Sequence, residues 1–183
     1  MSIDQHRTWQ KVEQRLAVET DPILRRNLQT LLQHMKAEAA LDMDKLMATV
    51  SKNARYQNFA QGGTGPVGKA AVQTFYEDFA ASGAHKLELD LDRLIVDKHC
   101  ILTEGVMRIA WPGKTLLEMG FKVDNPAADY LFEARTAILW PIDEDGLFIG
   151  EDSYVAGDGF EGIAGREIDP DDVVLYRPQA VAT

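Results

Sequence analysis

The spacing of apolar residues changes near residue 86, and this change limits the fold more than any other feature. Before it, apolar residues recur at helical spacing, as in Leu24, Leu28 and Leu31, which predicts amphipathic helices. From Lys86 on, apolar and polar residues nearly alternate, as in KLELDLDRLIV and HCILTEGVMRIAW, which predicts strands. Helices followed by a run of antiparallel strands favour an α+β fold, with the helices packed on one face of a curved sheet.

Three segments describe the predicted organisation of the chain. Residues 1–20 carry a first helical pattern and form an N-terminal helical extension. Pro22 suits the first position of a second helix, and residues 21–156 form the main domain. Residues 157–183 are rich in Gly and Asp, which indicates a C-terminal extension that wraps the domain or a partner subunit.

The charge and composition of the chain argue against several classes of function. It has 183 residues and a net charge of −10, whereas proteins that bind nucleic acids carry clustered Lys and Arg. No apolar run approaches the roughly twenty residues that a membrane span needs. We therefore predict a cytoplasmic protein without a nucleic-acid or membrane partner.

Metal and thiol chemistry are not indicated either. No pair of the four histidines has metal-ligand spacing, so we predict no metal and no cofactor. Cys100 is the only cysteine and cannot form an intramolecular disulfide. We interpret Cys100 as a small packed side chain, and His34, beside the apolar stripe of a helix, as a packing histidine.

The stretch ARYQNFAQGGTGPVGKAAVQTFYEDF, residues 54–79, carries information on both the fold and the site. It predicts a short strand, a Gly-rich turn and an amphipathic helix. Tyr56 and Asn58 are two residues apart on the strand, so their side chains share a face. Phe75, Tyr76 and Phe79 have a helical spacing that is more typical of a core than of ligand contacts. Whether Tyr56 and Asn58 line a pocket or form the polar edge of the core stays open here.

The order of these segments resembles the nuclear transport factor 2-like superfamily and, within it, the SnoaL-like group of small cone-shaped α+β proteins. The resemblance covers about Leu24 to Val155 and rests on AEAALDMDKLMATVSKNARYQNF, GPVGKAAVQTFYEDF and DEDGLFIGEDSY. It implies a curved antiparallel sheet wrapped around helices, a pocket for a small hydrophobic ligand, and a homodimer formed through the sheet. The superfamily holds isomerases, dehydratases, cyclases, epoxide hydrolases and noncatalytic proteins, so the fold alone does not assign the chemistry.

A local match to one enzyme of this group is closer but incomplete. YQNF followed by VGKAAVQTFYEDF is similar to the limonene-epoxide hydrolase pattern, which implies that Tyr56 and Asn58 hold an attacking water. The Arg-x-Asp pair of that enzyme would fall on Gly105 and Met107, and its second carboxylate near Ser153. In ketosteroid isomerases the base would fall on Asn58, which does not exchange a proton near neutral pH. Neither catalytic relay is therefore complete here.

The strand pattern also predicts which side chains face a pocket. Alternation puts Thr103, Met107 and Trp111 on one face of the central strand, and the resemblance turns that face inward. Glu151 is the preferred titratable group, because the resemblance turns its side chain inward, and a carboxyl enclosed by apolar side chains has a raised pKa. In the alternative interpretation, Glu151 pairs with Arg135 across the sheet as structure. The predicted catalytic residues are Tyr56, Asn58 and Glu151, and the predicted ligand contacts are Phe75, Thr103, Met107, Trp111 and Arg135.

Three hypotheses about function remain open at this point. The first is an isomerase, lyase or cyclase that acts on a small hydrophobic oxygenated molecule. The second is a noncatalytic protein that binds such a molecule, and a paired acid and base with shifted pKa values would argue against it. The third is a structural homodimer whose cone is filled by its own side chains, and an open cavity of several hundred Å³ would argue against that.

Overall fold

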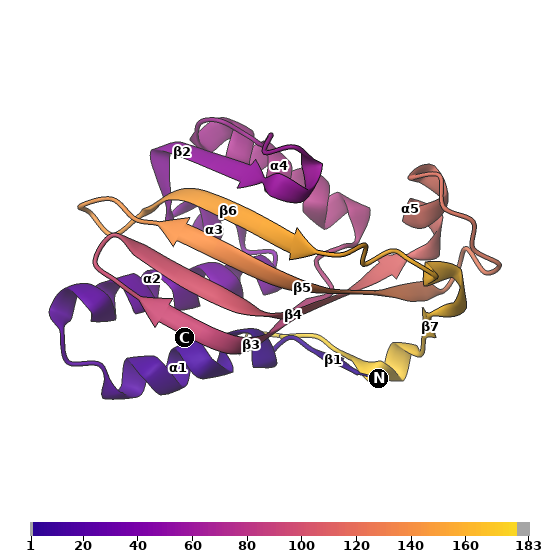
Figure 1. Ribbon diagram of the computed structural model, residues 1–183, viewed down its shortest axis with the longest axis horizontal. Coiled ribbons are helices and arrows are strands. Elements are labelled where there is room, and N and C mark those ends of the chain that lie inside the picture. Colours follow the sequence, from indigo (N-terminus) through magenta and orange to yellow (C-terminus); the bar gives the residue numbers. More distant parts are fainter. Residues whose placement is uncertain (1, 179–183) are drawn as a thin grey trace, which may run out of the picture.

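The computed structural model describes residues 2–178 and has an α+β fold in which helices cover one face of a curved sheet (Figure 1). The strands stand in the order β2-β6-β5-β4-β3, and β7 pairs with the start of β5. They span Val50–Asn58 (β2), Leu87–Val96 (β3), Cys100–Pro112 (β4), Asp129–Pro141 (β5), Phe148–Ala156 (β6) and Glu167–Ile168 (β7).

The helices come mainly before the long strands, as the sequence pattern predicts. They span Arg7–Val18 (α1), Pro22–Ala39 (α2), Met43–Met47 (α3), Lys69–Ser82 (α4) and Gly113–Glu118 (α5). Short 3₁₀ turns span Phe59–Gln61 (η1), Ile163–Gly165 (η2) and Pro170–Asp172 (η3). A short strand at each end of the chain, β1 (Ile3–Asp4) and β8 (Val173–Val174), pairs with the other in parallel.

Helix α2 begins where the sequence places its start. The Asp21 carboxylate accepts hydrogen bonds from the backbone N–H groups of Ile23 (2.8 Å) and Leu24 (3.2 Å), which caps the helix. Pro22 occupies the first helical position, where a missing N–H costs nothing. The cap and the proline together fix the residue at which α2 begins.

The sheet is mixed, so the prediction of an antiparallel sheet holds for β3 to β6 and is wrong for β2. Strand β2 pairs with β6 in parallel, whereas the other long pairs are antiparallel. The reason is that β2 and β6 start at the same end of the sheet. There the backbone N–H of Phe148 donates to the carbonyl of Thr49 at 2.9 Å, and both strands then run in the same direction.

Gly105 allows the sheet to bend, as its place inside a strand predicts. A Cβ atom on Gly105 would lie 2.1 Å from the carbonyl oxygen of Asp90 on β3. The register between the two strands shifts beside this point, between Leu91 and Arg93. Glycine therefore permits the close approach of β3 that accompanies the bulge.

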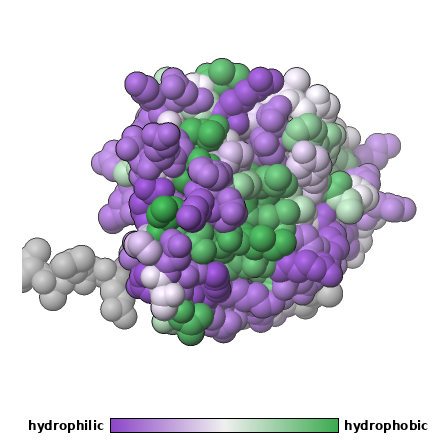
Figure 2. All heavy atoms as spheres, turned by 60° about the vertical axis from the view of Figure 1, so that its left-hand side comes forward, coloured by the Kyte–Doolittle hydropathy of each residue, from purple (hydrophilic) through white to green (hydrophobic). Residues whose placement is uncertain are grey.

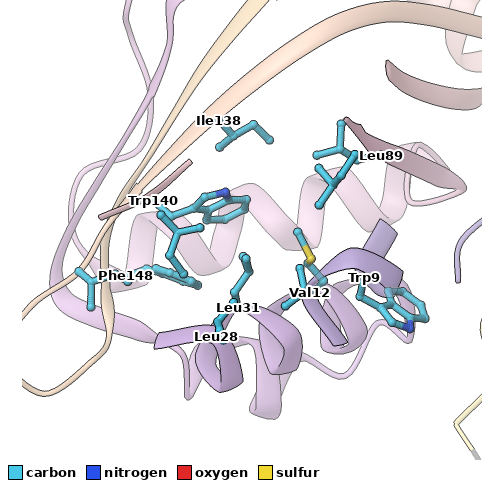
Figure 3. Packing of buried hydrophobic residues seen from close by; sticks show 12 residues of the cluster. Trp9, Val12, Leu28, Leu31, Leu89, Ile138, Trp140 and Phe148 are labelled. Carbon is cyan, nitrogen blue, oxygen red and sulfur yellow. The ribbon is translucent and has the colours of Figure 1, made fainter. Parts of the chain in front are cut away.

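The main apolar cluster lies between α1, α2 and the sheet (Figure 3). From α1, Trp9 and Val12 are 3% and 0% exposed, and Leu28 and Leu31 of α2 are fully buried. Figure 3 shows these helices placed against Ile138, Trp140 and Phe148 of the sheet. The segment predicted as an N-terminal extension thus contributes side chains to the same cluster as the sheet.

The described part of the C-terminal segment also packs on the domain. Tyr176 lies against Trp9, with ring centroids 4.9 Å apart, and Ile163 is buried beside Phe132. The predicted C-terminal extension continues to residue 183, and residues 179–183 lie outside the described part of the chain. Between residues 2 and 178, no helix is long and apolar enough to cross a membrane.

If α1 is part of the core, Trp9→Ala should lower the free energy of unfolding by about 3–5 kcal/mol, because it leaves a cavity in a packed cluster. Urea denaturation followed by circular dichroism measures this change. Val18→Ala is the matched control on the same helix, since Val18 is 72% exposed and its truncation should change stability by less than about 0.5 kcal/mol. Equal effects of the two variants would contradict a core role for α1.

Candidate functional site

A cavity of about 560 Å³ lies between the inner face of the sheet and α4. One side is apolar and is formed by β4 and β5, with Met107, Ile109, Trp111 and Phe132. Exposed residues such as Met119 form part of its rim. The opposite, polar side holds Glu38 of α2, Tyr76 of α4 and Glu151 of β6.

Two carboxyl groups at the polar side have pKa values near neutrality. Burial raises the pKa of Glu151 from its usual 4.5 to about 7. Burial, together with the negative charge of Glu151, raises the pKa of Glu38 to about 8. Apolar surroundings and a second carboxylate both disfavour the ionised form of a carboxylic acid. Glu38 and Glu151 can therefore both take up and release protons near pH 7.

The hydroxyl of Tyr76 connects this pair to a buried polar cluster. It lies 2.9 Å from Glu151 Oε2, 2.9 Å from His34 Nε2 and 3.3 Å from the hydroxyl of Tyr56. Burial raises the pKa values of Tyr56 and Tyr76 well above their usual range. Both phenols therefore keep their protons and serve as hydrogen-bond donors.

His34 is neutral, and its hydrogen bonds fix which ring nitrogen accepts. Burial lowers the pKa of His34 to about 3. The Thr49 hydroxyl donates to the carbonyl of Leu46 at 2.6 Å, so it must accept from His34 Nδ1–H, 2.7 Å away. His34 Nε2 is then left as an acceptor facing Tyr76.

The single proton of the Tyr76 hydroxyl therefore has two acceptors at 2.9 Å, Glu151 and His34. When Glu151 is ionised, Tyr76 donates to it, which stabilises the carboxylate. When Glu151 is protonated, it can donate to the Tyr76 oxygen while the Tyr76 proton turns to His34 Nε2. The cluster thus accommodates both protonation states of Glu151, as a group that exchanges protons requires.

The structure brings the three predicted catalytic residues together around a second, smaller cavity. Tyr56 is 4% exposed and shares a smaller cavity of about 280 Å³ with Asn58 and Glu151. Asn58 and Glu151 line both cavities. The Asn58 side-chain oxygen accepts from the backbone N–H of Ala60 at 3.1 Å and so caps η1. Glu151 points inward, as the resemblance implies.

Of the predicted ligand contacts, Phe75, Met107 and Trp111 line the large cavity. Thr103 faces the same side of the sheet but lies under the helices, where it is fully buried and accepts from Trp140 Nε1 at 2.9 Å. The placement of Thr103 in the cavity is therefore wrong, because α1 and α2 already fill that part of the inner face.

The placement of Arg135 in the pocket is also wrong. Its side chain lies on the outer face of β5 and forms ion pairs with Glu104 and, at 2.7 Å, with Asp92. Alternation along β5 turns Thr136 inward and Arg135 outward. A structural pair between Arg135 and Glu151, the alternative from the sequence, is wrong for the same reason.

Glu38 is the residue of the site that the sequence pattern did not reveal, and Tyr76 was assigned to the core. A signal for Glu38 does exist: it lies four residues after His34 on α2, so the two side chains share one helix face. His34 is the packing histidine that the sequence indicates, and each ring nitrogen lies within hydrogen-bond distance of a hydroxyl. Within residues 2–178, no group of three His, Cys, Asp or Glu side chains is arranged to hold a metal ion.

The raised pKa values make stability depend on pH in a defined direction. Between about pH 4.5 and pH 8, the folded protein keeps protons on Glu38 and Glu151 that the unfolded chain releases. The free energy of unfolding therefore falls as pH rises through this range. The double variant Glu38→Gln/Glu151→Gln has no such protons to release. Its free energy of unfolding should therefore fall less between pH 5 and pH 8 than that of the unaltered protein, by at least about 1 kcal/mol.

Urea denaturation at pH 5 and pH 8 gives both free energies for each protein. Glu144→Gln is the control, because Glu144 is exposed on the turn before β6 and its removal should shift both values alike. Parallel pH dependences of the double variant and the unaltered protein would contradict the raised pKa values.

Comparisons with known proteins agree on the fold and leave the activity open. No family model and no curated protein matches the sequence. A structure assigned as a SnoaL-like polyketide cyclase from Shewanella putrefaciens is 10% identical, with a TM-score of 0.63 over 85% of this chain and 92% of that one. An LEH-like epoxide hydrolase from M. tuberculosis is 16% identical, with a TM-score of 0.58 over 79% and 94% of the two chains.

An NTF2-like protein from Anabaena variabilis is 14% identical, with a TM-score of 0.56 over 78% of this chain and 96% of that one. At these identities the likeness concerns the fold and not the chemistry. The resemblance found in the sequence is thus confirmed at the level of the fold: the chain has the α+β architecture of the NTF2-like and SnoaL-like proteins.

Proposed function

We propose that the protein binds a small, largely apolar, oxygenated molecule in the large cavity and transfers protons on it with Glu38 and Glu151. One observation carries this proposal: two carboxyl groups with pKa values of about 8 and 7 line the same cavity of about 560 Å³. A general acid or base works best when its pKa lies near the pH at which it operates. Isomerisation, elimination and ring closure all use such groups.

The two carboxyl groups take complementary roles in this chemistry. Glu151 has the lower pKa, so it ionises first and serves as the base that removes a proton from a carbon beside a carbonyl group. Its charge helps Glu38 to keep a proton, and Glu38 then serves as the acid that protonates the substrate at another atom. Tyr76 holds Glu151 in place at 2.9 Å.

Epoxide hydrolysis, the activity named for one structural neighbour, has less support in this chain. The positions that would carry its relay are Gly105, Met107 and Ser153, which supply no charge. The carboxyl groups of this cavity come instead from α2 and β6. Noncatalytic binding does not need two carboxyl groups with shifted pKa values, and a cone filled by its own side chains would not leave a cavity of this size.

We also propose that the chain forms a homodimer through the outer face of the sheet. Apolar side chains gather in the middle of one face of the molecule, within a border of hydrophilic ones (Figure 2). On the outer face of the sheet, Ile95 is 60% exposed and stands beside Leu102, which in turn pairs with Leu139. Exposed apolar areas of this kind favour association. A cytoplasmic location stays a prediction.

Proton transfer can be measured without the natural substrate, through exchange of the α-hydrogens of 2-tetralone for deuterium in D₂O, followed by NMR. Glu151→Gln should lower the protein-catalysed rate by about 100-fold or more, because general acid–base catalysis typically contributes about 10²–10⁴. Glu38→Gln should also lower it. Glu144→Gln, at the exposed turn, should leave it unchanged. The proposal is wrong if the unaltered protein does not catalyse the exchange. It is also wrong if Glu38→Gln and Glu151→Gln both catalyse it at the unaltered rate.

The homodimer predicts twice the mass of one chain in size-exclusion chromatography with light scattering at micromolar concentration. Ile95→Arg should convert this species to a monomer, because it places a charge in the proposed interface. Val18→Arg, at an exposed site on α1, should not change the mass. A monomeric mass for the unaltered protein would rule out the dimer under these conditions.

A further inference from the structure

Thr136 presents a buried hydroxyl that no described protein atom satisfies. It lies on the inner face of β5, is 2% exposed and lines the large cavity. Its Oγ1 atom has no hydrogen-bond partner among residues 2–178. The residues beside it in the sheet, Gly105 on β4 and Val155 on β6, have no polar side-chain atom to offer.

A comparison within the same sheet shows that this is unusual. Thr103 also faces inward, and its hydroxyl accepts from Trp140 Nε1 at 2.9 Å. Buried polar groups in folded proteins normally have a partner, and a hydroxyl left without one destabilises the fold. Because Thr136 lines the cavity and its hydroxyl has no partner among the described residues, its partner belongs to whatever occupies the cavity.

The position of Thr136 separates it from the carboxyl groups. Ile138 pairs with Ser153 and Leu139 with Asp152, so the antiparallel register brings Trp140 level with Glu151. Thr136 and Trp140 are four residues apart, which corresponds to about 13 Å along a strand at about 3.3 Å per residue. The hydroxyl therefore lies beside a part of the ligand that is remote from the atoms that Glu38 and Glu151 reach.

We propose that Thr136 hydrogen-bonds a second oxygen function of the ligand, so that the cavity selects hydrophobic molecules with oxygen at two separated positions. One oxygen lies beside the reacting carbon at the carboxyl groups, and the other lies beside Thr136 on the wall of the cavity. This inference rests on the proposed function, because it assumes that the large cavity holds the substrate. It narrows the substrate class to extended diketones, hydroxyketones and their equivalents.

Two rigid probes test this selection, 2-acetylnaphthalene with one oxygen and 6-acetyl-2-naphthol with a second oxygen at the far end. Fluorescence titration should show that the unaltered protein binds the naphthol about five- to tenfold more tightly, as one added hydrogen bond provides. Thr136→Val replaces the hydroxyl by a methyl group and should abolish this preference. Thr136→Ser keeps a hydroxyl and should retain it. Affinity for 2-acetylnaphthalene should be the same in all three proteins.

Thermal unfolding without a ligand gives an independent readout. If the hydroxyl has no structural partner, Thr136→Val should keep or raise the melting temperature, whereas loss of a structural hydrogen bond would lower it. Trp111→Phe is a second control. Among residues 2–178, Trp111 is the other cavity-lining residue with an unpaired buried polar atom, its Nε1. This variant should leave the preference for the naphthol intact.

The outcomes separate this inference from the proposed function. Equal binding of both probes by the unaltered protein, or a preference that survives Thr136→Val, overturns the role of Thr136 and leaves the cavity as a ligand site. If the preference for the naphthol is lost in Trp111→Phe and kept in Thr136→Val, the second contact belongs to Trp111. This result also overturns the role of Thr136. Failure of both probes to bind overturns this inference, whereas the proton-transfer function is judged by the 2-tetralone exchange.

Discussion

The contact on which the rest of the site depends is the hydroxyl of Tyr76, which joins four elements. It lies within 3.3 Å of His34 on α2, Tyr56 on β2 and Glu151 on β6, and comes itself from α4. A polar group buried this deeply must be bonded, because each missing partner costs about 1–3 kcal/mol. The cluster therefore fixes how the helices meet the edge of the sheet, and it fixes the carboxyl group of Glu151 at the same time.

The inner face of the sheet is divided between packing and binding. Helices α1 and α2 cover one half with the apolar cluster around Leu28 and Trp140, whereas the other half borders the cavity under α4. Glu38 stands near the end of α2, where the packed half gives way to the open half. On the outer face, Arg108 pairs with Glu133 at 2.7 Å and with the fully buried Glu88 at 2.8 Å, so these charges are balanced by opposite ones on the side of the sheet away from the carboxyl pair.

The sequence could predict what depends on local pattern, and it could not predict what depends on packing between distant segments. Alternation along β6 puts Glu151 and Ser153 on one face, which the family resemblance turns inward, and a glycine inside β4 marks the bend at Gly105. Thr103 has the correct parity but is covered by α1, a fact that no strand pattern contains. Glu38 lies on a helix whose rotation about its axis is set by contacts with the sheet. Its partnership with Glu151, 113 residues away along the chain, appears only in three dimensions.

Burial in apolar surroundings makes the pair Glu38 and Glu151 reactive near pH 7, and it also lowers the stability of the fold. The apolar surroundings that raise the pKa values of Glu38 and Glu151 disfavour their ionised forms, so the site lowers stability in the pH range where it would exchange protons. The packed half of the sheet, with the segments at both ends of the chain tied together through Trp9 and Tyr176, stabilises the fold against this loss. A cone packed on both halves would be more stable but would leave the carboxyl groups no substrate to reach. The division of the inner face is therefore what allows one small domain to hold two carboxyl groups that exchange protons near pH 7 beside an open cavity.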